Sequence, residues 1–232
     1  MFTEQNKFFM SNEMSLDVHF IESKLQESLL KEHAPDIVKL ISEYISIVES
    51  TNTTITTSNN FDIAECINAH FNSLIKQLSL DGSSEIYNVI DSFRHAFLSY
   101  ATGGLRNLYL NQENEGWYPK VKITKVLEPN QIDTLPSHFQ VYRGCDISEL
   151  NSVNYGQSWS LSEKIACDFA FKIYDDDYNE WYDPNKRAVL TTTLSKEDIF
   201  YYSNIRGEEE VVVDIKKLKN VTLHKNNKTT PV

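Results

Sequence analysis

The chain has 232 residues, of which 41% are hydrophobic and 12% aromatic, and these proportions indicate a folded protein with a substantial core. Its formal net charge of −11 is spread along the sequence, which argues against a general nucleic-acid-binding sleeve, because such a protein needs a basic stripe. The three cysteines form no CxxC pair, which favours reduced thiols over a disulfide framework or a zinc site.

The N-terminal sequence contains only a short apolar run, from Phe8 to Met10, whereas a secretory signal needs a longer apolar core. No other run approaches the length that is needed to cross a membrane. We therefore expect the protein in the cytoplasm, or delivered into the cytosol of a target cell, without membrane contact.

The first half of the chain has the periodicity of helices. Apolar residues keep helical spacing in residues 35–48, and a polar stretch at residues 50–60 is predicted to be a loop or linker. A second helix is expected around residues 63–78, and a third at about residues 84–100, each followed by a glycine-containing stop. Residues 1–116 are therefore predicted to form a helical N-terminal region.

From about residue 117 the sequence is typical of β-structure. Runs rich in Val, Ile, Thr, Tyr and Phe are separated by turn formers, which predicts several short strands: VKITKV, FQVYRG, RAVLTTTL, DIFYYS and EVVVDI. One helix, SEKIACDFAFKIY, interrupts them, and Ser162 is expected to cap it. Residues 117–232 are predicted to form a β-rich core, either as a separate domain or as part of one continuous α+β domain.

Three short segments of this second half carry candidate chemistry. They are the strand end Tyr142–Gly144 with Arg143 at its centre, the Ser-x-Ser segment 158–160, and the acidic cluster 208–210 before an apolar strand. Each alone has an ordinary explanation, namely a structural ion pair, a helix cap and a solvated turn. Their occurrence together is what indicates a shared site.

These residue types suit the cleavage of NAD⁺. Breaking the nicotinamide–ribose bond generates an oxocarbenium-like ribose, which a carboxylate can stabilise. Arginine offers a planar fork for phosphate oxygens, and a hydroxyl on a neighbouring strand can hold the carboxylate in place. Since residues two apart in a strand share a face, Glu208 and Glu210 are expected to point into one cleft.

The segments resemble the R-S-E class of mono-ADP-ribosyltransferases, which includes clostridial binary-toxin enzymes and phage enzymes that modify host proteins. That pattern is an aromatic-Arg-Gly strand, a Ser-x-Ser strand with a helix ending in Phe-Ala (here Phe169-Ala170), and Glu-x-Glu before a Val-rich strand. The resemblance covers about residues 95–215. It implies a helical N-terminal lobe packed on a split mixed β-sandwich core of the ADP-ribosyltransferase type, which would bind NAD⁺ and catalyse the transfer.

The resemblance also implies individual roles. Glu210 would be the catalytic carboxylate, hydrogen-bonded by Ser158, and Glu208 would position or deprotonate the acceptor. Arg143 would bind an NAD⁺ phosphate and brace the fold, and the backbone of Gly144 would hold the nicotinamide carboxamide. Because the acidic cluster is a triplet, its middle glutamate could occupy the catalytic register instead.

Further residues are assigned to the same site. Tyr142 and Ser160 would complete the NAD⁺-binding set, and Arg187 is the arginine available where the family often places a second phosphate contact. Tyr201 and Tyr202 resemble the aromatic position that recognises the acceptor, with one of the two expected in the core.

Two features depart from the family pattern. Trp159 replaces a small residue, and the loop after the Ser-x-Ser helix is long and acidic. Tyr174, Tyr178 and Trp181 in that loop are candidates to stack on nicotinamide, or equally to pack or contact a partner.

These observations leave three functional hypotheses. The first is transfer of ADP-ribose to a protein side chain, with arginine favoured by the Glu-x-Glu pair, in a toxin, effector or phage enzyme. The second is transfer to RNA or DNA in phage–host conflict, and the third is a binding module with an inactive transferase fold. NAD⁺ serves as a substrate and no metal is expected. The N-terminal helices are a candidate docking surface for an antitoxin or a chaperone.

Overall fold

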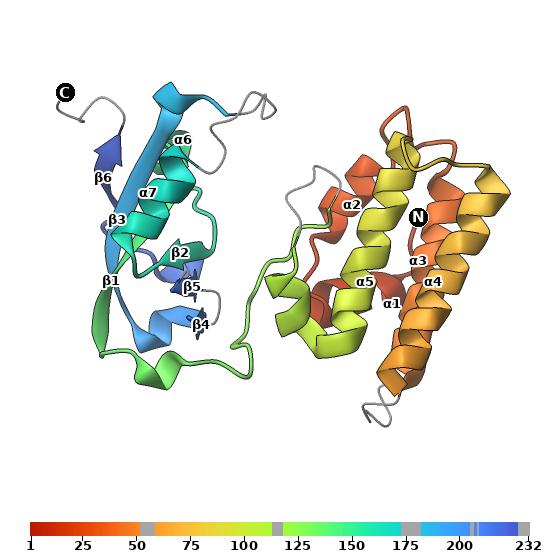
Figure 1. Cartoon of the computed structure of the whole chain (residues 1–232), viewed down its shortest axis with the longest axis horizontal. Coiled ribbons are helices and arrows are strands. Elements are labelled where there is room, and N and C mark those ends of the chain that lie inside the picture. The colour runs from red at the N-terminus through yellow and green to blue at the C-terminus, as the bar shows by residue number, and fades with distance from the viewer. Residues whose placement is uncertain (52–58, 113–117, 173–181, 205–206, 208, 227–232) are drawn as a thin grey trace. The chain divides into compact units, whose positions relative to one another are not determined.

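Apolar residues at helical spacing fold the first half of the chain into three long helices in the computed structural model (Figure 1). These are α3 (Ala34–Thr51), α4 (Asn59–Leu78) and α5 (Glu85–Leu110), and they occupy the three regions predicted to be helical. Shorter elements precede them, namely α1 (Glu4–Phe8), the π-helical turn η1 (Phe9–Glu13) and α2 (Val18–Lys24).

Helix α5 begins where the sequence predicts, and it consists of two helical segments separated at Gly103 and Gly104. The Ser84 hydroxyl accepts a hydrogen bond from the Tyr87 backbone N–H at 3.1 Å and so caps the helix. Gly103 and Gly104 have non-helical backbone angles, and the helix resumes after them as far as Leu110. The first helical segment of α5 therefore ends at the glycine pair, as predicted, and a second segment follows it after a kink.

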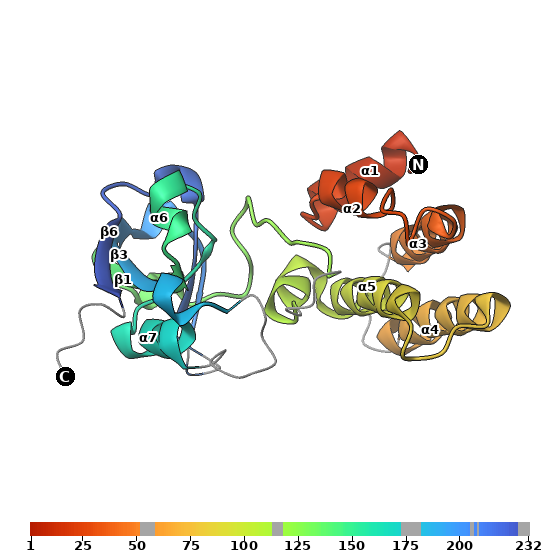
Figure 2. The same ribbon diagram turned by 90° about the horizontal axis from the view of Figure 1, so that it is seen from above.

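The long helices share an apolar core. The rings of Tyr44 in α3 and Phe97 in α5 are fully buried, with their centroids 5.4 Å apart. Helices α4 and α5 lie side by side in both ribbon views (Figures 1 and 2), and Phe71 packs edge-on against Tyr87 between them. Burial of these faces stabilises the helical part of the chain.

The chain divides into two compact units, Met1–Lys122 and Ile123–Val232. This boundary lies somewhat beyond the predicted one, which followed residue 116. The reason is a short connection to the helical unit: the Lys122 N–H donates to the Ser15 carbonyl at 2.8 Å, next to an isolated β-bridge.

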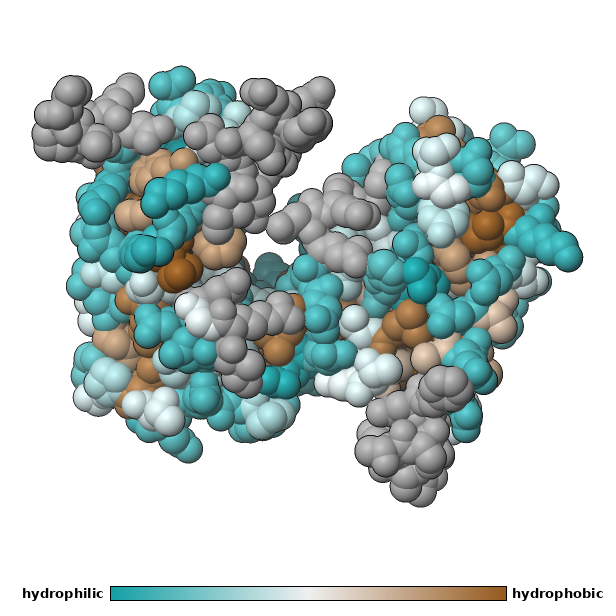
Figure 3. Space-filling view, viewed as in Figure 1, coloured by the Kyte–Doolittle hydropathy of each residue, from teal (hydrophilic) through white to brown (hydrophobic). Residues whose placement is uncertain are grey.

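The structure describes residues 1–51, 59–112, 118–172, 182–204, 207 and 209–226. Within these ranges no helix combines the length and the apolar character that crossing a membrane requires. On the face drawn in Figure 3, hydrophilic residues predominate among those described and hydrophobic ones appear in small separate groups.

The second unit is built on one six-stranded sheet in the order β4-β5-β2-β1-β3-β6, in which all neighbouring strands are antiparallel. The strands are β1 (His138–Asp146), β2 (Ser158–Ser160), β3 (Arg187–Ser195), β4 (Ile199–Ser203), β5 (Glu210–Val213) and β6 (Thr222–Asn226). Two α-helices accompany them, α6 (Ser148–Ser152) and α7 (Glu163–Phe171). Four short 3₁₀ helices complete the described part of this unit: η2 (Ile132–Thr134), η3 (Pro184–Lys186), η4 (Lys196–Asp198) and η5 (Ile215–Lys217).

The prediction of a helical region followed by a β-rich region is confirmed, with corrections. The runs FQVYRG, RAVLTTTL, DIFYYS and EVVVDI correspond to β1, β3, β4 and β5, but in VKITKV only Val121 forms a bridge, to Leu16 of the helical unit. The strand β6 is largely exposed, so it has no apolar alternation to reveal it. The described strands also form one antiparallel sheet, whereas a split mixed one was predicted. Pairing direction depends on contacts between segments that are distant in the sequence, so local patterns do not reveal it.

The two faces of the sheet have different neighbours. Val141 and Cys145 of β1 belong to a buried cluster with Trp159 and residues of β3, β4 and β5. The opposite face carries α7, which Figure 1 shows in front of β1 and β3. There Ala166 and Ala170 of α7 pack against Val189 of β3.

Gly144 marks the closest approach of α7 to the sheet. A Cβ atom at this position would lie 2.2 Å from the Ala166 carbonyl oxygen and 2.7 Å from the Ala170 nitrogen, both of which are backbone atoms. A glycine is therefore required here by helix–strand packing.

We predict that Gly144→Ala lowers the free energy of unfolding of the second unit by about 1–3 kcal/mol, because the helix backbone must shift to admit a methyl group. Chemical denaturation followed by circular dichroism measures the change. Gly82→Ala is the matched control, since a Cβ there meets nothing within 4 Å. Equal stability of Gly144→Ala and the parent protein would contradict the close packing.

Candidate active site

The antiparallel pairing of β2 with β5 brings a serine and a glutamate together. Ser158 lies opposite Val212 and Ser160 lies opposite Glu210, so Ser158 and Glu210 are diagonal neighbours on one face. The Ser158 hydroxyl donates a hydrogen bond to Glu210 Oε1 at 2.8 Å. The contact is solvent-accessible, and it matches the predicted partnership of these two residues.

The neighbouring glutamates are placed differently. Glu209 precedes β5 with a left-handed φ of 47°, and its carbonyl accepts the Leu161 N–H at 3.1 Å. Burial raises the pKa of the Tyr202 hydroxyl, and the nearby Glu209 carboxylate raises that pKa further. Of the two glutamates described, Glu210 is the one that contacts Ser158, and Glu208 lies outside the described residues.

Arg143 is held by a partner that the motif does not include. Its Nε and Nη2 donate to the two carboxylate oxygens of Glu149 in α6, each at 2.8 Å. Its Nη1 donates to the backbone carbonyl of Ser158 at 2.7 Å. The arginine thus reaches the Ser158 segment through the backbone, and its predicted phosphate contact stays a prediction.

The side chain of Arg143 lies on the other face of the sheet from the serine–glutamate pair. Side chains alternate along β1, and Gly144 faces α7, whereas Val141 and Cys145 face the buried cluster on the opposite side. Arg143 lies two residues from both Val141 and Cys145 in β1, so its side chain is on the same face of the sheet as theirs. The strand register puts Ser160, and with it Glu210, on the α7 side with Tyr142.

The remaining motif residues pack around α7. Tyr142 is half-buried and meets the ring of His224 edge-on, with the centroids 5.2 Å apart. Ser160 is buried, and its hydroxyl accepts the Ser162 N–H at 3.0 Å, which fixes the turn into α7. The Ser162 hydroxyl accepts the Ile165 N–H, so its predicted capping role is confirmed.

Arg187 is buried at the C-terminal end of α7. Its Nε donates to the Ala170 carbonyl at 3.2 Å, and its guanidinium lies over the ring of Tyr182. A cation at this end of a helix is favoured by the helix dipole. The contacts support a structural role, and the predicted phosphate contact of Arg187 stays a prediction.

Both tyrosines of the predicted acceptor-recognition position are buried. Tyr201 is 0% exposed and Tyr202 is 8% exposed, and the two alternate between the faces of β4. Only one of them was expected in the core. Tyr202 belongs to the buried cluster that includes Val211 of β5, and Tyr201 lies opposite Val212, which is also fully buried.

Two residues that the motif did not indicate organise the surroundings of β2. Glu149 binds Arg143 and also accepts the Gly156 N–H at 3.0 Å. The Gln157 side chain donates to the Ile123 carbonyl at 2.7 Å and accepts the Ile123 N–H at 2.8 Å. Neither has a sequence signal beyond being a polar residue in a loop or a short helix.

Other candidate features contribute nothing further to this site. The stacking candidates Tyr174, Tyr178 and Trp181 lie outside the described residues. In the described part of the chain no group of three or more His, Cys, Asp or Glu side chains could hold a metal ion.

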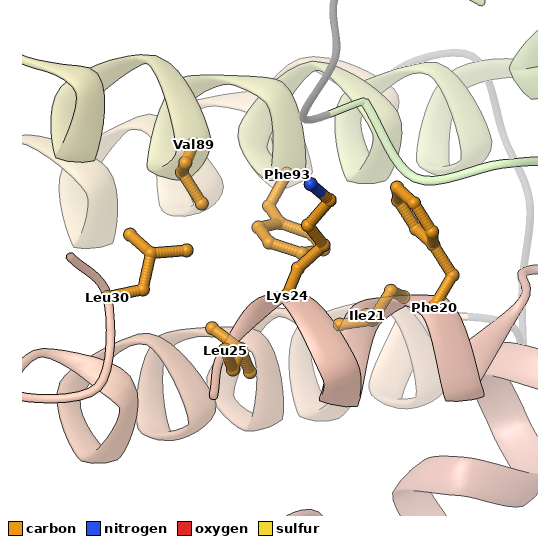
Figure 4. A pocket seen from close by; sticks show the side chains of 7 residues that line it. All are labelled: Phe20, Ile21, Lys24, Leu25, Leu30, Val89 and Phe93. Carbon is orange, nitrogen blue, oxygen red and sulfur yellow. The ribbon is translucent and has the colours of Figure 1, made fainter. Parts of the chain in front are cut away.

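An apolar cavity of the helical unit is shown in Figure 4, where Phe20 and Ile21 of α2 face Phe93 and Val89 of α5.

No protein-family model, curated protein or solved structure matched the chain in comparisons with each of these groups. Function is therefore inferred from the motif residues and the geometry that joins them.

The thiol of Cys145 provides a test of how β1 is packed beside the site. Burial raises the pKa of this thiol to about 12, and the Glu149 carboxylate raises it further. The thiol is therefore protonated at pH 8 and inaccessible, whereas Cys66 is exposed.

We predict that Ellman's reagent at pH 8 modifies Cys66 rapidly and Cys145 only on unfolding. Mass spectrometry of the labelled peptides over time distinguishes the two thiols. Labelling of Cys145 in the folded protein at the rate of Cys66 would contradict the described packing of β1.

Proposed function

We propose that the chain is a mono-ADP-ribosyltransferase of the R-S-E class that cleaves NAD⁺ and transfers ADP-ribose to a macromolecule. The observation that supports this most directly is the 2.8 Å hydrogen bond between the Ser158 hydroxyl and Glu210 on neighbouring strands. The two residues are 52 positions apart, and each belongs to a different segment of the motif. A protein acceptor, with arginine as the modified side chain, is the proposed substrate class.

In the proposed reaction the bond between nicotinamide and the ribose breaks, and nicotinamide leaves with the bonding electron pair. The ribose carbon becomes cationic, and the Glu210 carboxylate stabilises that charge. Ser158 holds the carboxylate in orientation before the reaction begins, which reduces the reorganisation needed in the transition state. The acceptor nitrogen then bonds to the ribose carbon and loses a proton.

The other motif residues support this chemistry in different ways. Arg143 acts as a brace on the backbone of β2, in agreement with its 2.7 Å hydrogen bond to the Ser158 carbonyl. Gly144 allows α7 to approach the sheet closely. Glu208 is proposed to orient and deprotonate the acceptor, and the β-rich unit is proposed to have the ADP-ribosyltransferase type of core.

The biological setting forms part of the proposal. The chain is proposed to act as a toxin, an effector or a phage enzyme in the cytosol of the cell that it modifies. The helical unit, Met1–Lys122, is proposed as the docking site for an antitoxin or a chaperone.

Glu210→Gln is predicted to lower the rate of NAD⁺ cleavage by about 100-fold or more while the fold stays intact, because only the stabilising charge is lost. Release of nicotinamide from NAD⁺ measures the rate, and thermal unfolding checks the fold. Glu209→Gln is the matched control, since that neighbouring side chain is not the one that Ser158 contacts. If the two variants were equally active, Glu210 would not be the catalytic carboxylate.

Glu208→Gln is predicted to preserve hydrolysis of NAD⁺ and to weaken transfer to the acceptor by about tenfold or more, because acceptor activation is lost while ribose stabilisation remains. Both rates can be followed with NAD⁺ labelled in the ADP-ribose part and a whole-cell lysate. A parallel fall of hydrolysis and transfer would contradict this division of roles. Label on nucleic acid instead of protein would assign the acceptor to RNA or DNA.

A further inference from the structure

Glu149 joins three segments that surround the candidate site. Its carboxylate accepts two hydrogen bonds from Arg143, at 2.8 Å each, and one from the Gly156 N–H at 3.0 Å. Arg143 lies in β1, Glu149 lies in α6, and Gly156 directly precedes the segment that leads into β2. One carboxylate therefore connects a long strand, a short helix and the residues that lead into the strand carrying Ser158.

The arrangement is sterically specific. A Cβ atom on Gly156 would lie 2.2 Å from Nη2 of Arg143, so glycine leaves the space that the guanidinium occupies. The Arg143 and Glu149 side chains are only 19% and 20% exposed, which limits screening of the pair by solvent. A planar guanidinium can bind a carboxylate with two donors and still direct the third nitrogen at a carbonyl, whereas a lysine cannot.

The third nitrogen is directed at the residue on which the site depends. Arg143 Nη1 donates to the Ser158 carbonyl at 2.7 Å, and the hydroxyl of the same residue donates to Glu210 at 2.8 Å. The backbone and the side chain of Ser158 thus connect the Glu149–Arg143 pair on one face of the sheet with the carboxylate on the other.

We propose that Glu149 is a positioning residue for catalysis. It orients Arg143, which holds the backbone of β2 so that the Ser158 hydroxyl reaches Glu210. This inference rests on the proposed function for its catalytic consequence, whereas its structural consequence can be measured without NAD⁺. Glu149 acts through other residues and does not contact the substrate.

The catalytic consequence is tested by a double-mutant cycle of Glu149→Gln and Ser158→Ala in NAD⁺ cleavage. Glu149→Gln alone is expected to lower kcat by about tenfold or more, because small displacements of aligned groups are costly. The same change in the Ser158→Ala protein is expected to lower kcat by less than about twofold, because the route through Ser158 is already lost. Equal losses in both backgrounds would overturn the proposal.

Arg143→Lys provides a second arm of the cycle. It is expected to lower kcat about as much as Glu149→Gln, and the two changes combined should cost little more than either alone. Glu197→Gln is the matched control, since this exposed carboxylate accepts a hydroxyl hydrogen bond from Ser195 remote from β2. It should leave kcat unchanged.

The structural consequence is tested by hydrogen–deuterium exchange of the full chain without NAD⁺. Glu149→Gln is expected to speed exchange about tenfold in peptides that cover β2 and β5, and to leave β3 and the helical unit unchanged. Unchanged exchange, or a uniform increase across the second unit, would overturn the proposal.

The kinetic and exchange experiments distinguish a failure of the proposed function from a failure of the proposed role of Glu149. If the parent protein does not cleave NAD⁺, the proposed function fails and the exchange result alone decides the role of Glu149. If the parent protein cleaves NAD⁺ and Glu149→Gln has unchanged kcat, the role of Glu149 fails and the proposed function stands.

Discussion

The candidate site depends on the position of β2, a strand of only three residues between β1 and β5. So short a strand makes few backbone hydrogen bonds, so side chains at its ends must fix it in place. Arg143 holds the Ser158 carbonyl, and the Gln157 side chain donates to the carbonyls of Ile123 and Val213. The serine–glutamate contact is a consequence of these restraints, and a small shift of β2 would break it.

The residues of the Tyr-Arg-Gly segment contact different neighbours on the two faces of the sheet. Tyr142 and Gly144 belong to the face that packs against α7, where the missing side chain of the glycine lets the helix approach. Arg143 points to the opposite face and meets Glu149. These adjacent residues therefore contact the helix α7, the short helix α6 and the neighbouring strand β2. Packing and hydrogen bonding alone thus give a reason for these residue types, independent of any chemistry at the site.

Periodicity predicted much of the fold. The long helices and α7 carry apolar stripes, and four strands have β-branched or aromatic runs, so local composition located them. The exposed strand β6 and the pairing directions were not predictable in this way, because neither leaves a local pattern. The serine–glutamate contact followed from the motif, but Glu149 did not, since a single acidic residue in a short polar helix has no distinguishing signal. The face of Arg143 was implicit in the sequence: Val141, Arg143 and Cys145 share a parity, and two of the three are apolar.

The placement of Arg143 on the face of Val141 and Cys145 bears on which of its two predicted roles it can fill. A pyrophosphate would have to compete with Glu149 for the donors of Arg143, and Glu149 already binds them through two 2.8 Å hydrogen bonds in a half-buried setting. Transferring the guanidinium to a phosphate would leave a carboxylate without its partner and would release the Ser158 carbonyl, which costs free energy at the moment when Glu210 must be held in place. The bracing and phosphate-binding roles therefore oppose each other in this chain. The observed distances favour bracing, and the functional hypothesis accordingly depends more on the serine–glutamate pair than on the arginine.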